Sequence, residues 1–159
     1  MNQWLNKSQE ISIKHFSSHE SLPIWAAVET LPFGCISKMI SLYGDTKTLR
    51  QLYRSFDLNA NIRTNAQIIH ALVYLRNLCA HYCRLWNREM IVSSPILKKM
   101  NKQYRGFDFE NRSVASIVIA EMYLVDSIDN DDAFSGKIIS FLENHQKYAE
   151  GIRKPLHWK

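Results

Sequence analysis

Apolar residues along the chain recur mainly with helical spacing, in blocks that turn-forming residues separate. No long alternating, β-branched run predicts a sheet. The longest block, about residues 65–89, contains neither glycine nor proline and predicts a single helix with Thr64 as its N-cap. The pattern therefore predicts an all-α fold, a bundle of about five to six helices with one long central helix.

Shorter helices are expected near residues 8–19, 111–128 and 132–150, with two more between Pro23 and Phe56. Asp45 is expected to cap the second of these two, because its carboxylate can accept backbone hydrogen bonds. The length and the short connections favour one domain over residues 1–150. Residues 151–159 are expected to form a flexible C-terminal tail.

Composition favours a cytoplasmic protein. The 159 residues are 46% apolar and 22% charged, as in ordinary globular domains. No apolar stretch is long enough to cross a bilayer, and the N-terminus lacks the apolar run of a signal peptide. Three cysteines, Cys35, Cys79 and Cys83, form an odd set that we interpret as free thiols in a reducing compartment, with Cys79 and Cys83 expected to be buried.

Cationic and amide side chains of the central helix share one face. A helical wheel with Arg76 at zero places them on an arc of about 0° to 140°. The members are Arg76, Asn77, His70, His81, Arg84, Asn87 and Arg88. Apolar residues occupy the opposite arc: Leu72, Leu75, Leu78, Cys79, Tyr82, Leu85 and Trp86.

This polar face lacks the acids and lysines that solvated helix faces usually carry. No Asp, Glu or Lys occurs between Ala66 and Arg88. Arginine and histidine suit phosphate recognition, and a formal net charge of +5 with a pI near 9.2 permits an anionic partner. Metal-independent RNA cleavage needs proton transfer and stabilisation of a charged phosphorane, which His81 and Arg76 can supply. Because the two lie about 140° apart on one helix, a second copy of the chain would help them converge on one phosphate.

The string LRNLCAHYCRLWNR, residues 75–88, resembles the signature of the Abi-like abortive-infection proteins of the AbiD/AbiF group, which are similar to HEPN-type ribonucleases. Upstream blocks at residues 13–16, 22–29 and 33–38 resemble the same family. The chain resembles the C-terminal half of longer members.

This resemblance implies a HEPN-like helical fold, a homodimer, RNA cleavage without a metal or cofactor, and a role in phage defence or as a toxin. Arg76 and His81 match the catalytic pair, and Asn77 matches the polar residue after the arginine. From the wheel we infer RNA contacts for Arg84, Asn87, Arg88 and His70. The expected partners are RNA, a second copy and an antitoxin made of RNA or protein, with no membrane.

Several alternatives remain beside this interpretation. Glu29 can support the site or be a surface carboxylate, and the basic run Lys98, Lys99, Lys102 and Arg105 can follow RNA or be a solvated loop. A zinc site from Cys79 and Cys83 with His81 or His70 is disfavoured because the wheel separates them. The main rival function is a non-catalytic HEPN-like module that binds a regulatory RNA or partner protein. Nucleotide transfer is disfavoured, since a phosphate loop and an acidic metal cluster are missing.

Overall fold

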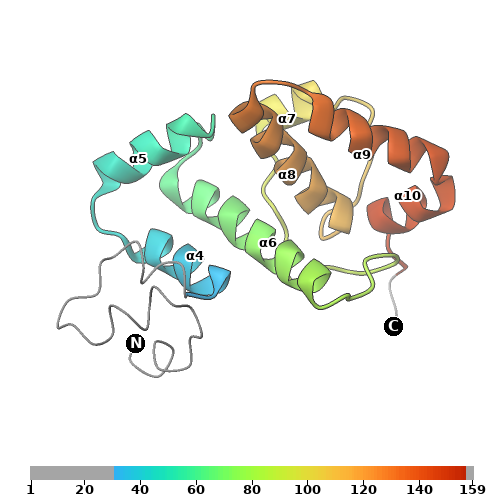
Figure 1. Ribbon diagram of the computed structural model, residues 1–159, viewed down its shortest axis with the longest axis horizontal. Coiled ribbons are helices and arrows are strands. Elements are labelled where there is room, and N and C mark those ends of the chain that lie inside the picture. Colours follow the sequence, from blue (N-terminus) through green and yellow to red (C-terminus); the bar gives the residue numbers. More distant parts are fainter. Residues whose placement is uncertain (1–30, 157–159) are drawn as a thin grey trace, which may run out of the picture. The chain divides into compact units, whose positions relative to one another are not determined.

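The computed structural model describes residues 31–156, and the regular secondary structure in this range is helical apart from one isolated bridge. Seven helices are described: α4 (Phe33–Leu42), α5 (Thr46–Ser55), α6 (Ile62–Ala80), α7 (Lys98–Gln103), α8 (Val114–Asp129), α9 (Ala133–Asn144) and α10 (Gln146–Arg153) (Figure 1). The chain divides into two compact units, residues 1–42 and 43–159. Of the first unit, α4 is the described helix. The all-α prediction is confirmed, while the HEPN-like character of the bundle stays a prediction.

Side-chain caps define where α5 and α6 begin. The Asp45 carboxylate accepts hydrogen bonds from the backbone of Lys47 at 2.9 Å and of Thr48 at 3.2 Å, which confirms Asp45 as an N-cap. The prediction of Thr64 as the cap of the central helix is wrong. Asn61 holds that position, and its Oδ1 accepts from the Thr64 backbone nitrogen at 2.8 Å. The helix therefore begins at Ile62.

Helix α8 forms the core of the second unit. It contacts α6, α7, α9 and α10, which surround it in Figure 1. Its N-terminal residue, Val114, and Ile117 are almost fully buried and join a cluster contributed by several helices. The other buried members are Ala71, Leu75, Leu78, Met90, Leu142, Ala149 and Ile152. Because this cluster includes both α6 and α10, the end of α6 and the C-terminal helix share one core.

The C-terminal helices differ from their prediction. The helix expected over residues 132–150 is two helices, and the chain turns at His145, whose Nδ1 lies 2.8 Å from the Phe141 carbonyl oxygen. Helix α10 runs on to Arg153, with Gly151 and Ile152 buried. The flexible tail predicted from residue 151 is therefore wrong for residues 151–153, since Ile152 packs into the core. The single domain expected over residues 1–150 stays a prediction.

A charged junction fastens the loop between α5 and α6. Lys99 on α7 donates to both carboxylate oxygens of Asp57, at 2.6 and 2.7 Å, and the Tyr123 hydroxyl on α8 donates to the same group. These bonds, with Lys99 contributing most, lower the pKa of Asp57. The loop that leads into α6 is thus tied to two other helices.

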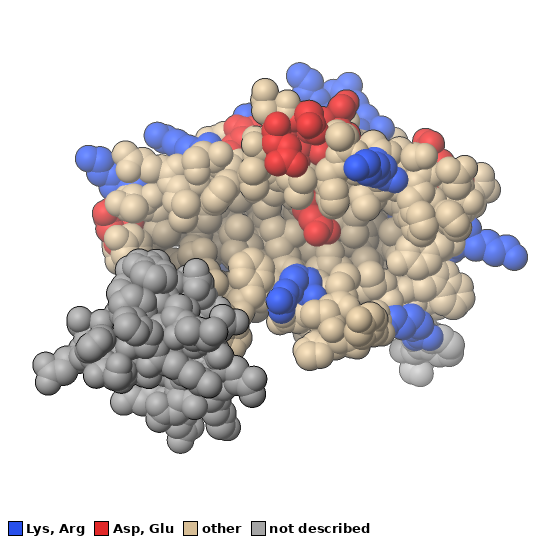
Figure 2. Space-filling view, in the orientation of Figure 1, with Lys and Arg blue, Asp and Glu red and all other residues tan. Residues whose placement is uncertain are grey.

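Charge is unevenly spread over the described surface. Figure 2 shows one group of acidic side chains near the top of this face, with further acidic, Lys and Arg side chains scattered over the rest. Along the sequence, Asp129, Asp131 and Asp132 fall where α8 gives way to α9. None of the described helices is both long enough and apolar enough to span a membrane.

Candidate functional site

Arg76, Asn77 and His81 lie together at the C-terminal end of α6. The Arg76 guanidinium donates a hydrogen bond from Nη1 to the Asn77 Oδ1 at 3.2 Å, and the His81 backbone nitrogen donates to the Asn77 carbonyl at 3.1 Å. Both Arg76 and His81 are exposed. Neither has an ion-pair partner in the range 31–156. Their charged or titratable groups are therefore open to a ligand.

The helix ends immediately before the histidine. Ala80 is the last residue of α6 and His81 is its C-cap, so the prediction of one helix to residue 89 is wrong. The Cys83 backbone nitrogen donates to the Leu78 carbonyl at 2.9 Å and the Tyr82 nitrogen to the Cys79 carbonyl at 3.0 Å, which is the Schellman arrangement. Tyr82 occupies the left-handed position of this motif, with φ of 52°.

Tyr82 is also misplaced by the wheel. It was expected on the buried arc, yet its side chain is 97% exposed. A residue at the left-handed position after the helix no longer follows the 100° rotation that the wheel assumes. An aromatic ring consequently projects into solvent one residue after His81.

Asn87 is buried rather than exposed, so its placement on the polar face is wrong. Its side chain is 7% exposed, and its backbone nitrogen donates to the Gly151 carbonyl at 3.0 Å. The neighbouring Trp86 indole donates to the Lys147 carbonyl at 3.1 Å. These two bonds fasten the segment after α6 to α10. The structure therefore places Asn87 among structural contacts and away from the surface.

Arg84 and Arg88 remain close together although they leave the helix. Arg88 is half-buried, and its Nη1 donates to the Arg84 carbonyl at 3.2 Å, whereas the Arg84 side chain is exposed. Both follow the turn that carries His81. The structure thus keeps them near the end of α6 by a folded loop, in place of the continuous helix face that was predicted.

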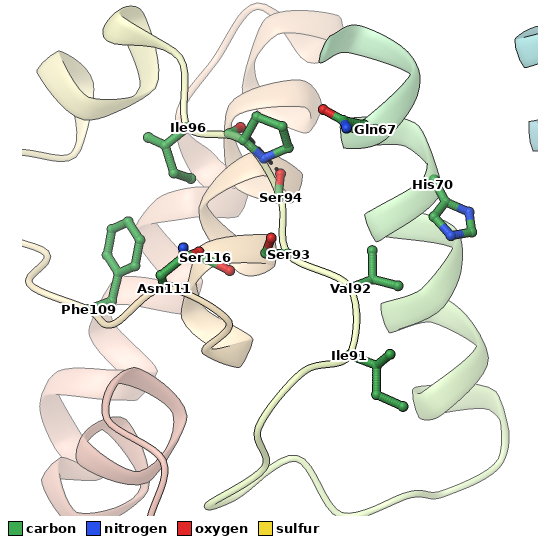
Figure 3. A pocket seen from close by; sticks show the side chains of 11 residues that line it. Gln67, His70, Ile91, Val92, Ser93, Ser94, Ile96, Phe109, Asn111 and Ser116 are labelled. Carbon is green, nitrogen blue, oxygen red and sulfur yellow. Dashed lines mark hydrogen bonds between the residues drawn. The ribbon is translucent and has the colours of Figure 1, made fainter. Parts of the chain in front are cut away.

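His70 lies farther back on α6, beside a cavity of about 720 Å³. Figure 3 shows Gln67 reaching from the same helix toward Ser94, with Phe109 on the far side of the cavity. The wall combines amides and hydroxyls with apolar side chains, namely Gln67, Ser93, Ser94, Asn111 and Ser116 with Ile91, Val92, Pro95, Ile96 and Phe109. The structure separates His70 from the Arg76 and His81 end of the helix, where the wheel had grouped them.

Glu29, the carboxylate considered as support for the site, lies outside the described residues. The half-buried carboxylate near the end of α6 is instead Glu121 on α8, whose pKa is raised by burial. Sequence reasoning missed it, because a single glutamate in an otherwise apolar helix carries no motif.

The cysteines of this region are thiols. Partial burial, followed by the Glu121 charge, raises the pKa of Cys79, which disfavours the thiolate that zinc ligation needs. Cys79 is exposed and Cys83 half-buried, so the expectation of a buried Cys79 is wrong. Within residues 31–156, no group of three metal-ligating side chains lies close enough to hold a metal ion.

Comparison with known proteins gives one family match. Searches of curated proteins and of solved structures find no significant match. The sequence model of the family described as Abi-like protein matches residues 1–87. Because this match covers more than half of the sequence and includes Arg76, Asn77 and His81, the chain belongs to the family of Abi-like proteins.

Proposed function

We propose that this Abi-like protein is a metal-independent, HEPN-type endoribonuclease that acts as a homodimer. The family points to abortive infection as the biological setting, and RNA cleavage is a chemistry by which such a protein can stop growth. The proposal rests chiefly on one observation: Arg76, whose guanidinium donates to the Asn77 side chain, and His81, the C-cap, are both exposed at the end of α6 and form no ion pair in the range 31–156.

The residues suit cleavage by the ribose itself. The 2′-oxygen attacks phosphorus and the bond to the 5′-oxygen breaks, leaving a 2′,3′-cyclic phosphate and a 5′-hydroxyl. His81 of one copy takes the 2′-hydroxyl proton and returns it to the leaving 5′-oxygen, beside the Arg76 of the second copy. Arg76 stabilises the charged phosphorane through its fork of donors. Asn77 holds the arginine side chain in place.

A second copy accounts for the openness of this helix end. A single α6 supplies one histidine and one arginine about 140° apart on an exposed surface, whereas the reaction needs both at one phosphate. Two helix ends related by a twofold axis would supply both groups and enclose the phosphate. Arg84 and Arg88 would then contact flanking phosphates, and His70 a more distant part of the strand.

Cleavage in EDTA tests the proposal. Labelled RNA is incubated with wild type, His81→Ala and the matched surface variant His145→Ala, and the product ends are mapped. We expect 2′,3′-cyclic phosphate ends from wild type and His145→Ala, with a loss of about 10²–10⁴-fold in rate for His81→Ala. Cutting that needs magnesium, or that survives in His81→Ala, contradicts the mechanism. RNA binding without cutting, equal in all three proteins, favours the non-catalytic module.

A further inference from the structure

A second cluster of arginines lies at the opposite end of α6 from His81. A cavity of about 630 Å³ opens between α5 and the start of α6. Its cationic wall comprises Arg50 and Arg54, one turn apart on α5, and Arg63 in the first turn of α6. The remaining lining residues are Leu58, Asn59, Ala60, Asn61, Ile62 and Asn65. Helix α5 and the capped start of α6 together shape this cavity.

The three arginines are not neutralised within the described chain. None of the residues that line the cavity is acidic, and Arg50, Arg54 and Arg63 form no ion pair in the range 31–156. The nearest acid along the sequence, Asp57, is already bound by Lys99 and Tyr123. Three guanidinium groups around one cavity repel one another unless an anion joins them.

Backbone donors add to this positive potential. The N-cap Asn61 satisfies the backbone nitrogens of Thr64 and Asn65, but those of Ile62 and Arg63 have no partner among the described residues. Both residues line the cavity. They stand at the positive end of the 19-residue helix α6, where unpaired N–H groups bind phosphate readily.

One wall of the cavity holds an acceptor without a donor. Asn65 is 2% exposed, and its Nδ2 donates to the carbonyls of Leu58 at 3.1 Å and Ala60 at 3.2 Å. Its Oδ1 is buried with no partner in the described structure. Leaving a buried acceptor unpaired is costly, and a small rotation of the amide toward a ligand hydroxyl or amine would remove that cost. Inorganic phosphate carries donors only on the charged group itself, whereas a nucleotide also has hydroxyl and amine donors several ångströms from its phosphate.

We propose that this cavity binds the phosphate and sugar of a nucleotide, either free or as the 5′-terminal nucleotide of an RNA. The volume falls in the range of small-molecule sites, about 300–1,000 Å³. The cavity is distinct from the cleavage site proposed above, because Arg63 and His81 are separated by about 27 Å along the helix at 1.5 Å per residue. This site therefore goes beyond the proposed ribonuclease activity and does not depend on it.

Calorimetric titration with AMP tests the proposal on the full chain. We expect AMP to bind wild type more tightly than inorganic phosphate does. Arg54→Gln and Arg63→Gln should each weaken AMP binding about tenfold or more, since each removes a charged hydrogen-bond donor. Arg105→Gln, an exposed arginine on the turn after α7, removes the same charge and should leave binding within about twofold. His81→Ala should bind AMP as wild type does, so loss of cleavage and loss of this site remain separable.

Competition identifies the source of the nucleotide. Displacement of AMP by a 5′-phosphorylated RNA, but not by the same RNA with a 5′-hydroxyl, assigns the cavity to an RNA end. Persistence of AMP binding in the presence of either RNA assigns it to a free nucleotide. Equal weakening in Arg105→Gln, or no binding of AMP and of 5′-phosphorylated RNA up to millimolar concentration, overturns the proposal.

Discussion

The two ends of α6 both present arginine, but they are built differently. At the N-terminal end, Arg63 joins two arginines of α5 around a cavity. At the C-terminal end, Arg76 and His81 stand exposed on the helix surface. One chain thus encloses a cavity at the N-terminal end of α6, the closed end, and presents exposed side chains at the C-terminal end, the open end.

The ends also differ in how the helix is terminated. At the N-terminal end, the Asn61 side chain caps the helix, and asparagine is one of the residues preferred at this position. The C-terminal end is capped by backbone hydrogen bonds alone. Tyr82 there takes the left-handed conformation that glycine usually adopts. Such strain is found most often at functional sites. The two ends of α6 therefore differ both in how they are capped and in backbone strain.

The largest effect is expected at the open end, when Arg76 and His81 are removed from different copies of the chain. Arg76→Ala and His81→Ala should each lower cleavage by about 10²–10⁴-fold. In a mixture refolded together, a heterodimer contains one intact Arg76 and one intact His81. We expect the mixture to cleave RNA well above either variant alone, measured as the initial rate at equal total protein.

The matched control for this mixture lies at the closed end. Arg63→Gln alone should cleave RNA at the wild-type rate, because Arg63 lines a different cavity. If the mixture of Arg76→Ala and His81→Ala is no faster than its better component, the shared site is wrong even when wild type cleaves.

The sequence predicted the buried and exposed positions within α6 better than it predicted where the helix ends. Periodicity correctly identified Leu75 and Leu78 as buried and Arg76 as exposed, although it also placed the exposed Cys79 on the buried arc. It failed beyond that residue because the signal sought for a helix end was glycine or proline. Here the chain turns at Tyr82, and the segment that follows is fastened to α10 by Trp86 and Asn87, contacts that local propensity does not record.

The site residues show the same limit. The pair Arg76 and His81 was identified from the acid-free polar face and the family-like string at residues 75–88, and both stay exposed although the helix ends between them. Asn87 was misassigned because its environment comes from Gly151, 64 positions later in the chain. The arginine cavity was missed since Arg50, Arg54 and Arg63 meet only when α5 folds against α6.

A smaller effect, on stability, is expected where Trp86 and Asn87 fasten the segment after α6 to α10. A Cβ at Gly151 would lie 2.4 Å from the Trp86 Nε1 and 2.9 Å from the Asn87 Oδ1. Gly151→Ala should therefore displace the indole and lower the free energy of unfolding by about 1–3 kcal/mol. Chemical denaturation measures this change.

Gly136→Ala provides the control, because Gly136 lies within α9 and no atom would lie within 4 Å of the new Cβ. That variant should gain about 0.5–1 kcal/mol from helix propensity. Equal behaviour of the two alanine variants would show that Trp86 and Asn87 do not require the glycine.

At the closed end, Asn61→Ala removes the side-chain cap and should cost about 0.5–2 kcal/mol in the free energy of unfolding. Asn61→Asp keeps an acceptor at the cap and should retain the stability. Since Asn61 also lines the arginine cavity, the new carboxylate should weaken AMP binding while thermal unfolding stays unchanged. Loss of stability in both variants would assign Asn61 a role other than capping.

The smallest effect concerns the strain at Tyr82. With φ of 52°, a side chain bearing a Cβ is disfavoured, and the ring is 97% exposed, so it contributes little packing. Tyr82→Gly should therefore raise the free energy of unfolding by less than about 1 kcal/mol. Tyr82→Ala removes the ring but keeps the Cβ, and should give no such gain. If alanine stabilises as much as glycine, the exposed ring is the source of the cost, and the two ends of α6 do not differ in backbone strain.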